Sequence, residues 1–120
     1  MENMNLRNCA YLGDALWELH VRNKTIFITE NSKKLHELTT SLVKTDFQVK
    51  LLNAINNLLT DEELELVRRA RNLPIPVARR AIQNDYRLST AFEALIGYWY
   101  LYDKDRLAFI LEKLENELNL

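Results

Sequence analysis

The amino-acid sequence predicts an all-α protein that folds as one domain. Glycine and proline occur only twice each among the 120 residues, so tight turns are few. Long stretches repeat an apolar residue every three or four positions, the spacing that places side chains on one face of a helix. An apolar fraction of 48% is sufficient for a hydrophobic core, and no segment resembles a domain linker. We therefore expect about six or seven helices in a single domain of residues 1–120.

A long first helix is expected over residues 6–23. Apolar and small side chains occupy most positions around it, including Leu6, Ala10 and Trp17, so much of its surface should be buried. The next segment, residues 24–30, is rich in β-branched and aromatic side chains. Because no second strand-like segment could pair with it, this segment predicts an extended connector or the end of the helix.

Two further helices are expected before residue 60. Asn31 or Ser32 can cap the second helix, because a side-chain oxygen there accepts a hydrogen bond from a free backbone N–H group of the first turn. Thr45 or Asp46 can cap the third helix in the same way. Apolar side chains of this third helix repeat at helical spacing as far as Leu59.

The best-defined helix start lies at Thr60. Glu63 follows three positions later, and the two residues together form the pattern of a capping box. Pro74 and Pro76 then interrupt the helical pattern, because proline lacks an N–H group and disfavours a helical conformation in the residue before it. Residues 72–77 are therefore predicted to form a loop.

Three helices are expected after this loop. A short one over residues 77–84 would lead to a strongly apolar helix over residues 86–102. Asp103 can cap a last amphipathic helix that extends to Leu118. The tryptophan and tyrosine side chains of the apolar helix are best explained by packing in the core or against a second subunit.

Composition and charge exclude several classes of function. Sixteen Lys and Arg residues against 17 Asp and Glu residues give a net charge of −1, so no field of the whole molecule attracts nucleic acid or membranes. Cys9 is the only cysteine, which excludes an intrachain disulfide and a Cys-rich zinc site, and we expect it to be a small core residue. Neither a secretory leader nor an apolar segment of about 18 residues is evident, so a cytoplasmic protein is expected.

Two acidic residues lie in otherwise apolar helical segments. Asp14 follows Gly13 near the start of the chain, and Glu93 precedes Gly97 by one helical turn. A buried carboxylate is costly unless it meets a cation, a hydrogen-bond donor or water. Glycine inside a helix costs about 1 kcal/mol relative to alanine, so each glycine indicates the close approach of another segment. The two helices could therefore cross with Asp14 facing Glu93.

Such a pair of acids has two interpretations. Two adjacent carboxylates repel each other unless one is protonated or a cation lies between them, and oxygen ligands suit Mg²⁺ or Mn²⁺. Asp14 and Glu93 are metal ligands in the first interpretation. In the second, each acid is a structural hydrogen-bond acceptor.

Arginines are concentrated between residues 68 and 87. Asp85 is the only acid in this window, so its six arginines give a local charge of +5. Their planar guanidinium groups suit phosphates and could follow a nucleic-acid backbone. The alternative is a solvated face on which some arginines pair with acids just upstream. The six residues are Arg68, Arg69, Arg71, Arg79, Arg80 and Arg87.

Two short motifs resemble one known family. Residues 11–15, Tyr-Leu-Gly-Asp-Ala, resemble the signature helix of the ribonuclease III fold. Residues 90–97, Thr-Ala-Phe-Glu-Ala-Leu-Ile-Gly, resemble the second acidic motif of that fold. The short bacterial Mini-ribonuclease III branch is the better match, because the sequence Arg-Arg-Ala-Arg-Asn at residues 68–72 and the chain length also fit it.

The resemblance implies an all-α endonuclease domain that acts as a homodimer on double-stranded RNA. It also implies Mg²⁺-dependent cleavage to 5′-phosphate and 3′-hydroxyl ends, with precursor large-subunit (23S) ribosomal RNA as the substrate. Asp14 and Glu93 would bind the metal and orient the attacking water. The residues that would contact RNA are Arg68, Arg69, Arg71, Asn72, Tyr86 and Arg87.

The sequence departs from longer members of that family at three positions that hold acids in them. Arg7, Ala10 and Thr90 stand there, so the metal would take more water or phosphate ligands. Glu18 shares a helix face with Asp14 and either assists the site or pairs along its own helix. The sparse acids leave open an RNA-binding protein of this fold that does not cleave. The near-zero net charge leaves open a helical protein-interaction module.

Overall fold

The computed structural model describes residues 4–75 and 83–120, and the regular elements in these ranges are all helical. In these two ranges six α-helices and one 3₁₀ helix follow one another, which confirms the all-α prediction. None of the helices described there is both long enough and apolar enough to cross a membrane. The elements are α1 (Leu6–Thr25), α2 (Ser32–Val43), α3 (Thr45–Ile55), η1 (Asn56–Leu58), α4 (Asp61–Arg71), α5 (Gln83–Tyr102) and α6 (Lys104–Leu118).

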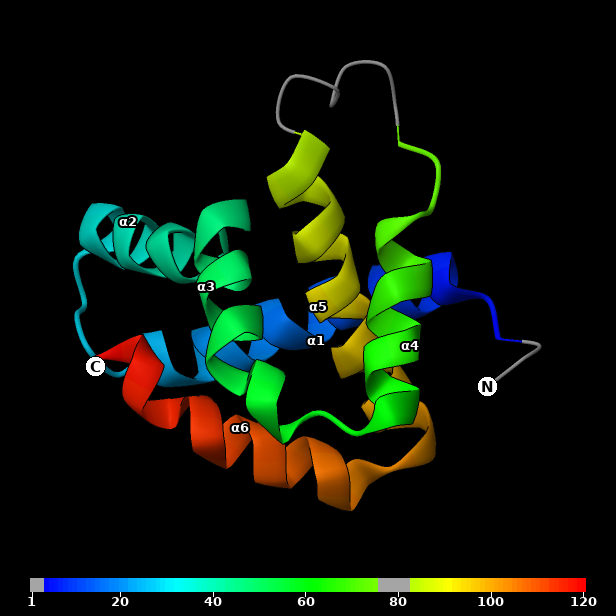
Figure 1. Cartoon of the computed structure of the whole chain (residues 1–120). Coiled ribbons are helices and arrows are strands. Elements are labelled where there is room, and N and C mark those ends of the chain that lie inside the picture. The colour runs from blue at the N-terminus through cyan, green and yellow to red at the C-terminus, as the bar shows by residue number, and fades with distance from the viewer. Residues whose placement is uncertain (1–3, 76–82) are drawn as a thin grey trace.

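Helix α5 runs through the middle of the molecule, and other helices pack around it (Figure 1). Helix α1 crosses α5, while α3 and α4 lie on either side of it. Apolar side chains follow one another in the central turns of α5, as a helix enclosed by neighbours requires. The side chains of Ala91, Phe92 and Leu95 are completely buried there.

Two glycines allow α1 and α5 to cross at very short distance. A Cβ atom placed on Gly13 would lie 1.7 Å from the backbone oxygen of Glu93. On the other side of the crossing, a Cβ atom on Gly97 would lie 2.0 Å from the backbone oxygen of Cys9. Each helix therefore supplies one glycine against the backbone of the other, in agreement with the close approach expected from the sequence.

Most helix ends lie where the sequence predicts them. Helix α1 ends at Thr25, so the β-branched segment that follows contains a helix end and a connector, not a strand. The side chain of Asn31 caps α2, and the side chain of Asp103 caps α6. Thr60 and Glu63 form the predicted capping box at the start of α4, each side chain accepting a hydrogen bond from the backbone N–H group of the other.

The predicted start and end of the third helix are wrong. Lys44 is the N-cap of α3, in place of Thr45 or Asp46, and its side chain makes no capping hydrogen bond. The same residue is the C-cap of α2, so the chain passes directly from one helix into the next without room for a separate cap. Helix α3 ends at Ile55, because two asparagines follow and asparagine competes with helical hydrogen bonding.

The predicted boundary between a short helix and the apolar helix is also wrong. Gln83 and Asn84 belong to α5, which begins three residues earlier than expected. Asp85 lies in its first turn, where a negative charge favours the start of a helix. The other residues of the predicted short helix, 77–82, lie outside the described residues, and with them Arg79 and Arg80 of the predicted basic stretch.

A buried carboxylate joins α4 to α5 and α6. Glu63 accepts hydrogen bonds from Trp99 Nε1 at 2.7 Å and from Arg106 Nη2 at 2.8 Å. Burial of Glu63 opposes its ionisation, yet the bonds from Arg106, the Thr60 backbone and Trp99 together lower its pKa below the ordinary value. Ionised Glu63 therefore stabilises the packing of the start of α4 against α5 and α6.

Replacing Glu63 with Gln should lower the free energy of unfolding by roughly 2 kcal/mol near neutral pH, because charge-assisted hydrogen bonds are lost while the shape of the side chain stays. The folded-state pKa of Glu63 lies below its unfolded value, so this stabilisation is present above the unfolded pKa and is lost as the pH falls through the folded pKa. Urea unfolding at neutral and acidic pH measures both effects. Glu65→Gln is the control, since Glu65 pairs with Arg68 on the exposed surface. Equal losses for the two variants would contradict the prediction.

Candidate active site

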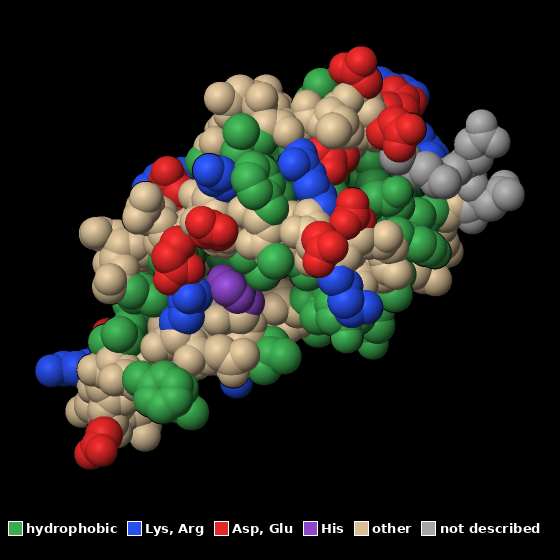
Figure 2. Space-filling view, turned by 90° about the horizontal axis from the view of Figure 1, so that it is seen from below, with side chains coloured by type: hydrophobic (Ala, Val, Ile, Leu, Met, Phe, Trp, Pro, Cys, Tyr) green, Lys and Arg blue, Asp and Glu red, His purple; other side chains and the backbone are tan. Residues whose placement is uncertain are grey.

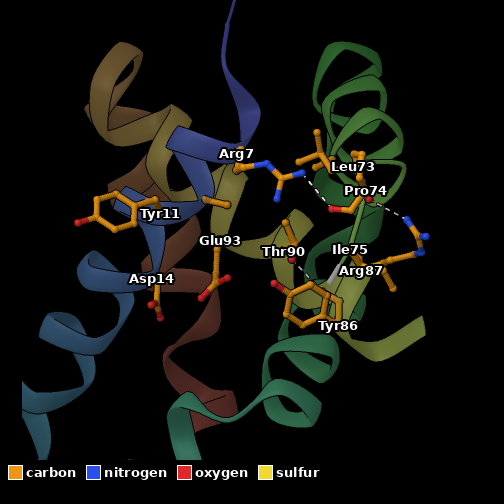
Figure 3. A pocket seen from close by; sticks show the side chains of 12 residues that line it. Arg7, Tyr11, Asp14, Leu73, Pro74, Ile75, Tyr86, Arg87, Thr90 and Glu93 are labelled. Carbon is orange, nitrogen blue, oxygen red and sulfur yellow. Dashed lines mark hydrogen bonds between the residues drawn. The ribbon is translucent and has the colours of Figure 1, made fainter. Parts of the chain in front are cut away.

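Asp14 and Glu93 lie side by side where α1 crosses α5. Gly13 precedes Asp14 and packs on the backbone of Glu93, so the crossing that this glycine permits also brings the two acids together. Figure 3 shows both carboxylate groups directed into the same space. Within the described part of the chain, no salt bridge involves either acid. The pair is therefore not neutralised by a neighbouring lysine or arginine there.

The proximity of the two acids changes the ionisation of Glu93. Burial of its carboxyl group, the hydrogen bond to Asp14 and the negative charge of Asp14 raise the pKa of Glu93 to about 8. A hydrogen bond with Gln48 acts in the opposite direction and favours the ionised form. Glu93 is therefore largely protonated at neutral pH until a cation compensates the charge of the pair.

The acids line an open cavity of about 190 Å³ between α1, α5 and the chain that follows α4. This volume has room for several water molecules. Among the described residues, no group of three or more His, Cys, Asp or Glu side chains could hold a metal ion, so the acids are a pair. Two hard oxygen donors beside space for water fit Mg²⁺, which keeps several waters and needs only one or two protein carboxylates.

The basic end of α4 lies next to this cavity. Ala70, Leu73 and Pro74 line the cavity. The four predicted RNA contacts at this end of α4 do not line it: Arg68, Arg69, Arg71 and Asn72. Arg71 and Asn72 are exposed to solvent. Arg68 is also exposed, but Glu65 accepts hydrogen bonds from its Nε and Nη2 atoms, so this arginine pairs along the helix as the alternative interpretation proposed. Arg69 is half-buried on the same helix end.

Tyr86 and Arg87 lie on the cavity wall with the two acids. The Arg87 guanidinium group donates hydrogen bonds to the backbone oxygens of Arg71 at 2.6 Å and of Leu73 at 3.0 Å. Arg7 lines the cavity from α1 and donates a hydrogen bond to the backbone oxygen of Pro74 at 2.9 Å. The cavity thus has the two carboxylates at one end and two guanidinium groups at the other, beside residues 73 and 74 that follow α4.

A model of the "Ribonuclease III domain" family matches residues 7–104 of the chain, a range that includes both acids. The chain belongs to the ribonuclease III family. It is 44% identical to a Mini-ribonuclease 3 from Gloeobacter violaceus, over 92% of this chain and 82% of that protein. It is 36% identical to a Mini-ribonuclease 3 from Clostridium tetani, over 100% of this chain and 78% of that protein.

The fold is also that of a solved structure. A crystal structure of a protein from Fusobacterium nucleatum matches with a TM-score of 0.85 and 27% sequence identity, over 97% of each chain. Together these similarities confirm the Mini-ribonuclease III branch and the class of endoribonuclease that the sequence predicted. The two motifs that carried the resemblance are the segments that cross in the structure.

Gln48 is a site residue of this ribonuclease III domain that sequence reasoning missed. Its side chain is buried in α3, where it accepts a hydrogen bond from the Ser89 hydroxyl at 2.5 Å and donates one to the Val43 backbone oxygen at 3.2 Å. The same amide forms the hydrogen bond that favours ionised Glu93. A polar residue on the apolar face of the predicted third helix is the signal that could have found it.

Glu18 does not join the two acids at the cavity. Its carboxylate pairs with Arg22, one turn further along α1, at 3.2 Å. This is the helix-paired role that the sequence left open beside a role in the site.

Proposed function

We propose that the protein is a cytoplasmic, Mg²⁺-dependent endoribonuclease that cleaves double-stranded RNA and matures precursor 23S ribosomal RNA. Its products would carry 5′-phosphate and 3′-hydroxyl ends. The observation that carries the proposal is the pair of acids, Asp14 and Glu93, which share one open cavity beside the basic end of α4. Membership of the ribonuclease III family supports the same reaction class.

Asp14 and Glu93 would hold the metal ion. When bound, Mg²⁺ supplies positive charge next to the scissile phosphate and makes an attacking water more acidic. The contribution of the chain is to keep two carboxylates adjacent in a cavity with room for water and a phosphate oxygen. Because Glu93 holds a proton in the metal-free protein, binding of the ion should release one.

The end of α4 would hold the RNA backbone. Its last turn and C-cap supply four polar or basic residues, Arg68, Arg69, Arg71 and Asn72. Tyr86 lies on the nearby cavity wall. The opposite side is less suitable for a polyanion, since Figure 2 shows acidic and basic side chains interspersed over the face that includes α6. A-form RNA presents phosphates and 2′-hydroxyls in a shallow minor groove, so contacts of this kind recognise shape more than sequence.

A homodimer would place two such sites on the two strands of one duplex. Several large apolar side chains stay exposed on a single chain, among them Tyr11, Leu101 and Tyr102. Exposed apolar groups of this size favour burial against a partner, and a second copy is the partner that a symmetric duplex requires. Equilibrium sedimentation of the purified protein tests this part of the proposal.

A cleavage assay tests the proposed reaction. A stem of precursor 23S ribosomal RNA, incubated with the protein and Mg²⁺, should be cut in both strands, and EDTA should abolish cutting. Mn²⁺ should also support cutting when it is added in place of Mg²⁺, because it accepts the same oxygen ligands. Binding of the stem without cutting would favour the alternative, a catalytically inactive RNA-binding protein of this fold. Failure to bind any duplex at low salt would overturn both.

Removing a charge at the end of α4 should weaken RNA binding and its dependence on salt. Arg71→Ala should reduce the slope of log K against log salt concentration by about one, because one fewer counterion is released from RNA. Lys113→Ala on α6 is the matched control and should leave the slope unchanged. A titration of a duplex at several salt concentrations measures both variants. Equal slopes for Arg71→Ala and the parent would contradict a phosphate contact at this residue.

A further inference from the structure

Two guanidinium groups hold the chain where it leaves α4. Arg87, on α5, donates from Nη1 to two backbone oxygens, those of Arg71 and Leu73. Arg7, on α1, donates from Nη2 to the backbone oxygen of Pro74. Figure 3 shows the two side chains approaching residues 73 and 74 from opposite sides. Residues 71–74 are called the α4 exit segment below.

The backbone at the end of α4 explains why a cation is needed there. The last carbonyl groups of any helix lack partners within the helix, and they carry the negative end of its dipole. The exit segment satisfies two of them itself, because the N–H groups of Asn72 and Leu73 donate to the oxygens of Arg69 and Ala70. The oxygen of Arg71 receives its hydrogen bond from Arg87. Pro74 has no N–H group to donate to this oxygen, so the side chain of Arg87 completes the cap of α4.

The same contacts connect the exit segment to both acid-bearing helices. Arg7 lies two turns before Asp14 on α1, and Arg87 lies less than two turns before Glu93 on α5. The exit segment is thus tied to α1 and α5 at the cavity where the two acids meet. These hydrogen bonds add to the packing of α4 on α5 and hold the end of α4 near Asp14 and Glu93.

We propose that Arg7 and Arg87 are positioning residues that clamp the α4 exit segment beside the acid pair. In this role Arg87 acts through the backbone of residues 71 and 73 and does not serve as a phosphate contact of its own. The clamp sets the register between the RNA-holding end of α4 and the cleaving pair. This inference rests on the proposed function for its consequence, while the clamp itself is a property of the protein without RNA.

Hydrogen exchange of the RNA-free protein tests the clamp directly. In Arg87→Gln, the amides of Asn72 and Leu73 should exchange about tenfold faster than in the parent, since hydrogen bonds from a charged donor are lost. Arg7→Gln should loosen the same amides less, because it removes one bond instead of two. Amides of α6 serve as an internal reference, so a variant that unfolds globally is recognised by their faster exchange.

Salt dependence of duplex binding separates positioning from a phosphate contact. Arg87→Gln should weaken duplex binding without changing the slope of log K against log salt concentration. Loss of a phosphate contact instead makes that slope less steep by about one. Arg71→Gln is the matched control, because the exposed side chain of Arg71 lies at the same helix end, whereas only its backbone oxygen accepts the hydrogen bond from Arg87. It should lower the slope and leave the exchange of Asn72 and Leu73 unchanged.

Two outcomes would overturn the clamp. One is unchanged exchange of Asn72 and Leu73 in Arg87→Gln, and the other is a slope lowered by about one in that variant. If the parent binds no duplex, the proposed function fails, yet the exchange rates of the free protein still decide whether Arg87 holds the exit segment.

Discussion

Glu93→Gln should reduce the rate of RNA cleavage by more than about a hundredfold while leaving duplex binding close to that of the parent. Loss of a group that merely supports a metal ligand costs roughly 10–100-fold, so loss of a ligand itself should exceed that range. The side chain stays the same size, and the basic end of α4 is untouched. Single-turnover cleavage of a labelled duplex at saturating protein, with binding measured in parallel, gives both quantities.

The stability of the same variant provides an independent check. The pKa of Glu93 is about 8 in the folded protein and near 4.5 when unfolded, so the folded state binds the proton more tightly. The stabilisation by this proton is complete below the unfolded pKa and is lost as the pH rises through the folded pKa. Because a glutamine side chain cannot ionise, metal-free Glu93→Gln should melt at a higher temperature than the parent above about pH 8.

Addition of Mg²⁺ should reverse that order. An ion bound between Asp14 and Glu93 stabilises the folded parent, whereas Glu93→Gln lacks one of the two ligands and should gain little. Glu18→Gln is the matched control, since Glu18 pairs with Arg22 away from the cavity. If Mg²⁺ raises the melting temperature of the parent and of Glu93→Gln equally, the acids do not form the metal site.

The helices and the acid pair could be predicted because their signals are local. Thr60 and Glu63 mark a helix start within four residues, and the side-chain geometry of a capping box is fixed by the backbone alone. Gly13 and Gly97 are costly in a helix, so each pointed to a close crossing before any partner was known. The two glycines and their neighbouring acids already indicated that the two helices cross with Asp14 facing Glu93, and the resemblance to the ribonuclease III family then implied that both acids bind one metal ion.

Contacts between distant segments could not be predicted in this way. The sequence marks Arg87 as one more positive charge in a basic stretch, and only the fold shows that its donors meet the backbone of α4. The same holds for Gln48, because its role in the site comes from hydrogen bonds to Ser89 and Glu93, which lie on another helix. Charge and polarity are visible in a sequence, but the partners that give them a role are set by packing.

Gly13→Ala should produce the largest loss of stability from a single methyl group. In an exposed helix this change would stabilise the protein by up to about 1 kcal/mol. Here the added Cβ would lie 1.7 Å from the backbone oxygen of Glu93, so α1 and α5 must move apart. We expect the free energy of unfolding to fall by about 3 kcal/mol or more, measured by urea denaturation. Cleavage should fall as well, because the displaced backbone is that of a metal-binding residue in the proposed site.

The sign of the change in stability separates crowding at the crossing from helix propensity, because propensity alone would make Gly13→Ala more stable than the parent. Ala108→Gly, at an exposed position of α6, reports propensity alone and should cost about 1 kcal/mol. Gly97→Ala crowds the other side of the crossing, where its Cβ would lie 2.0 Å from the backbone oxygen of Cys9, and should destabilise in the same direction as Gly13→Ala. If either glycine variant were more stable than the parent, α1 and α5 would be further apart than described. The two carboxylates would then lose the scaffold that makes them neighbours.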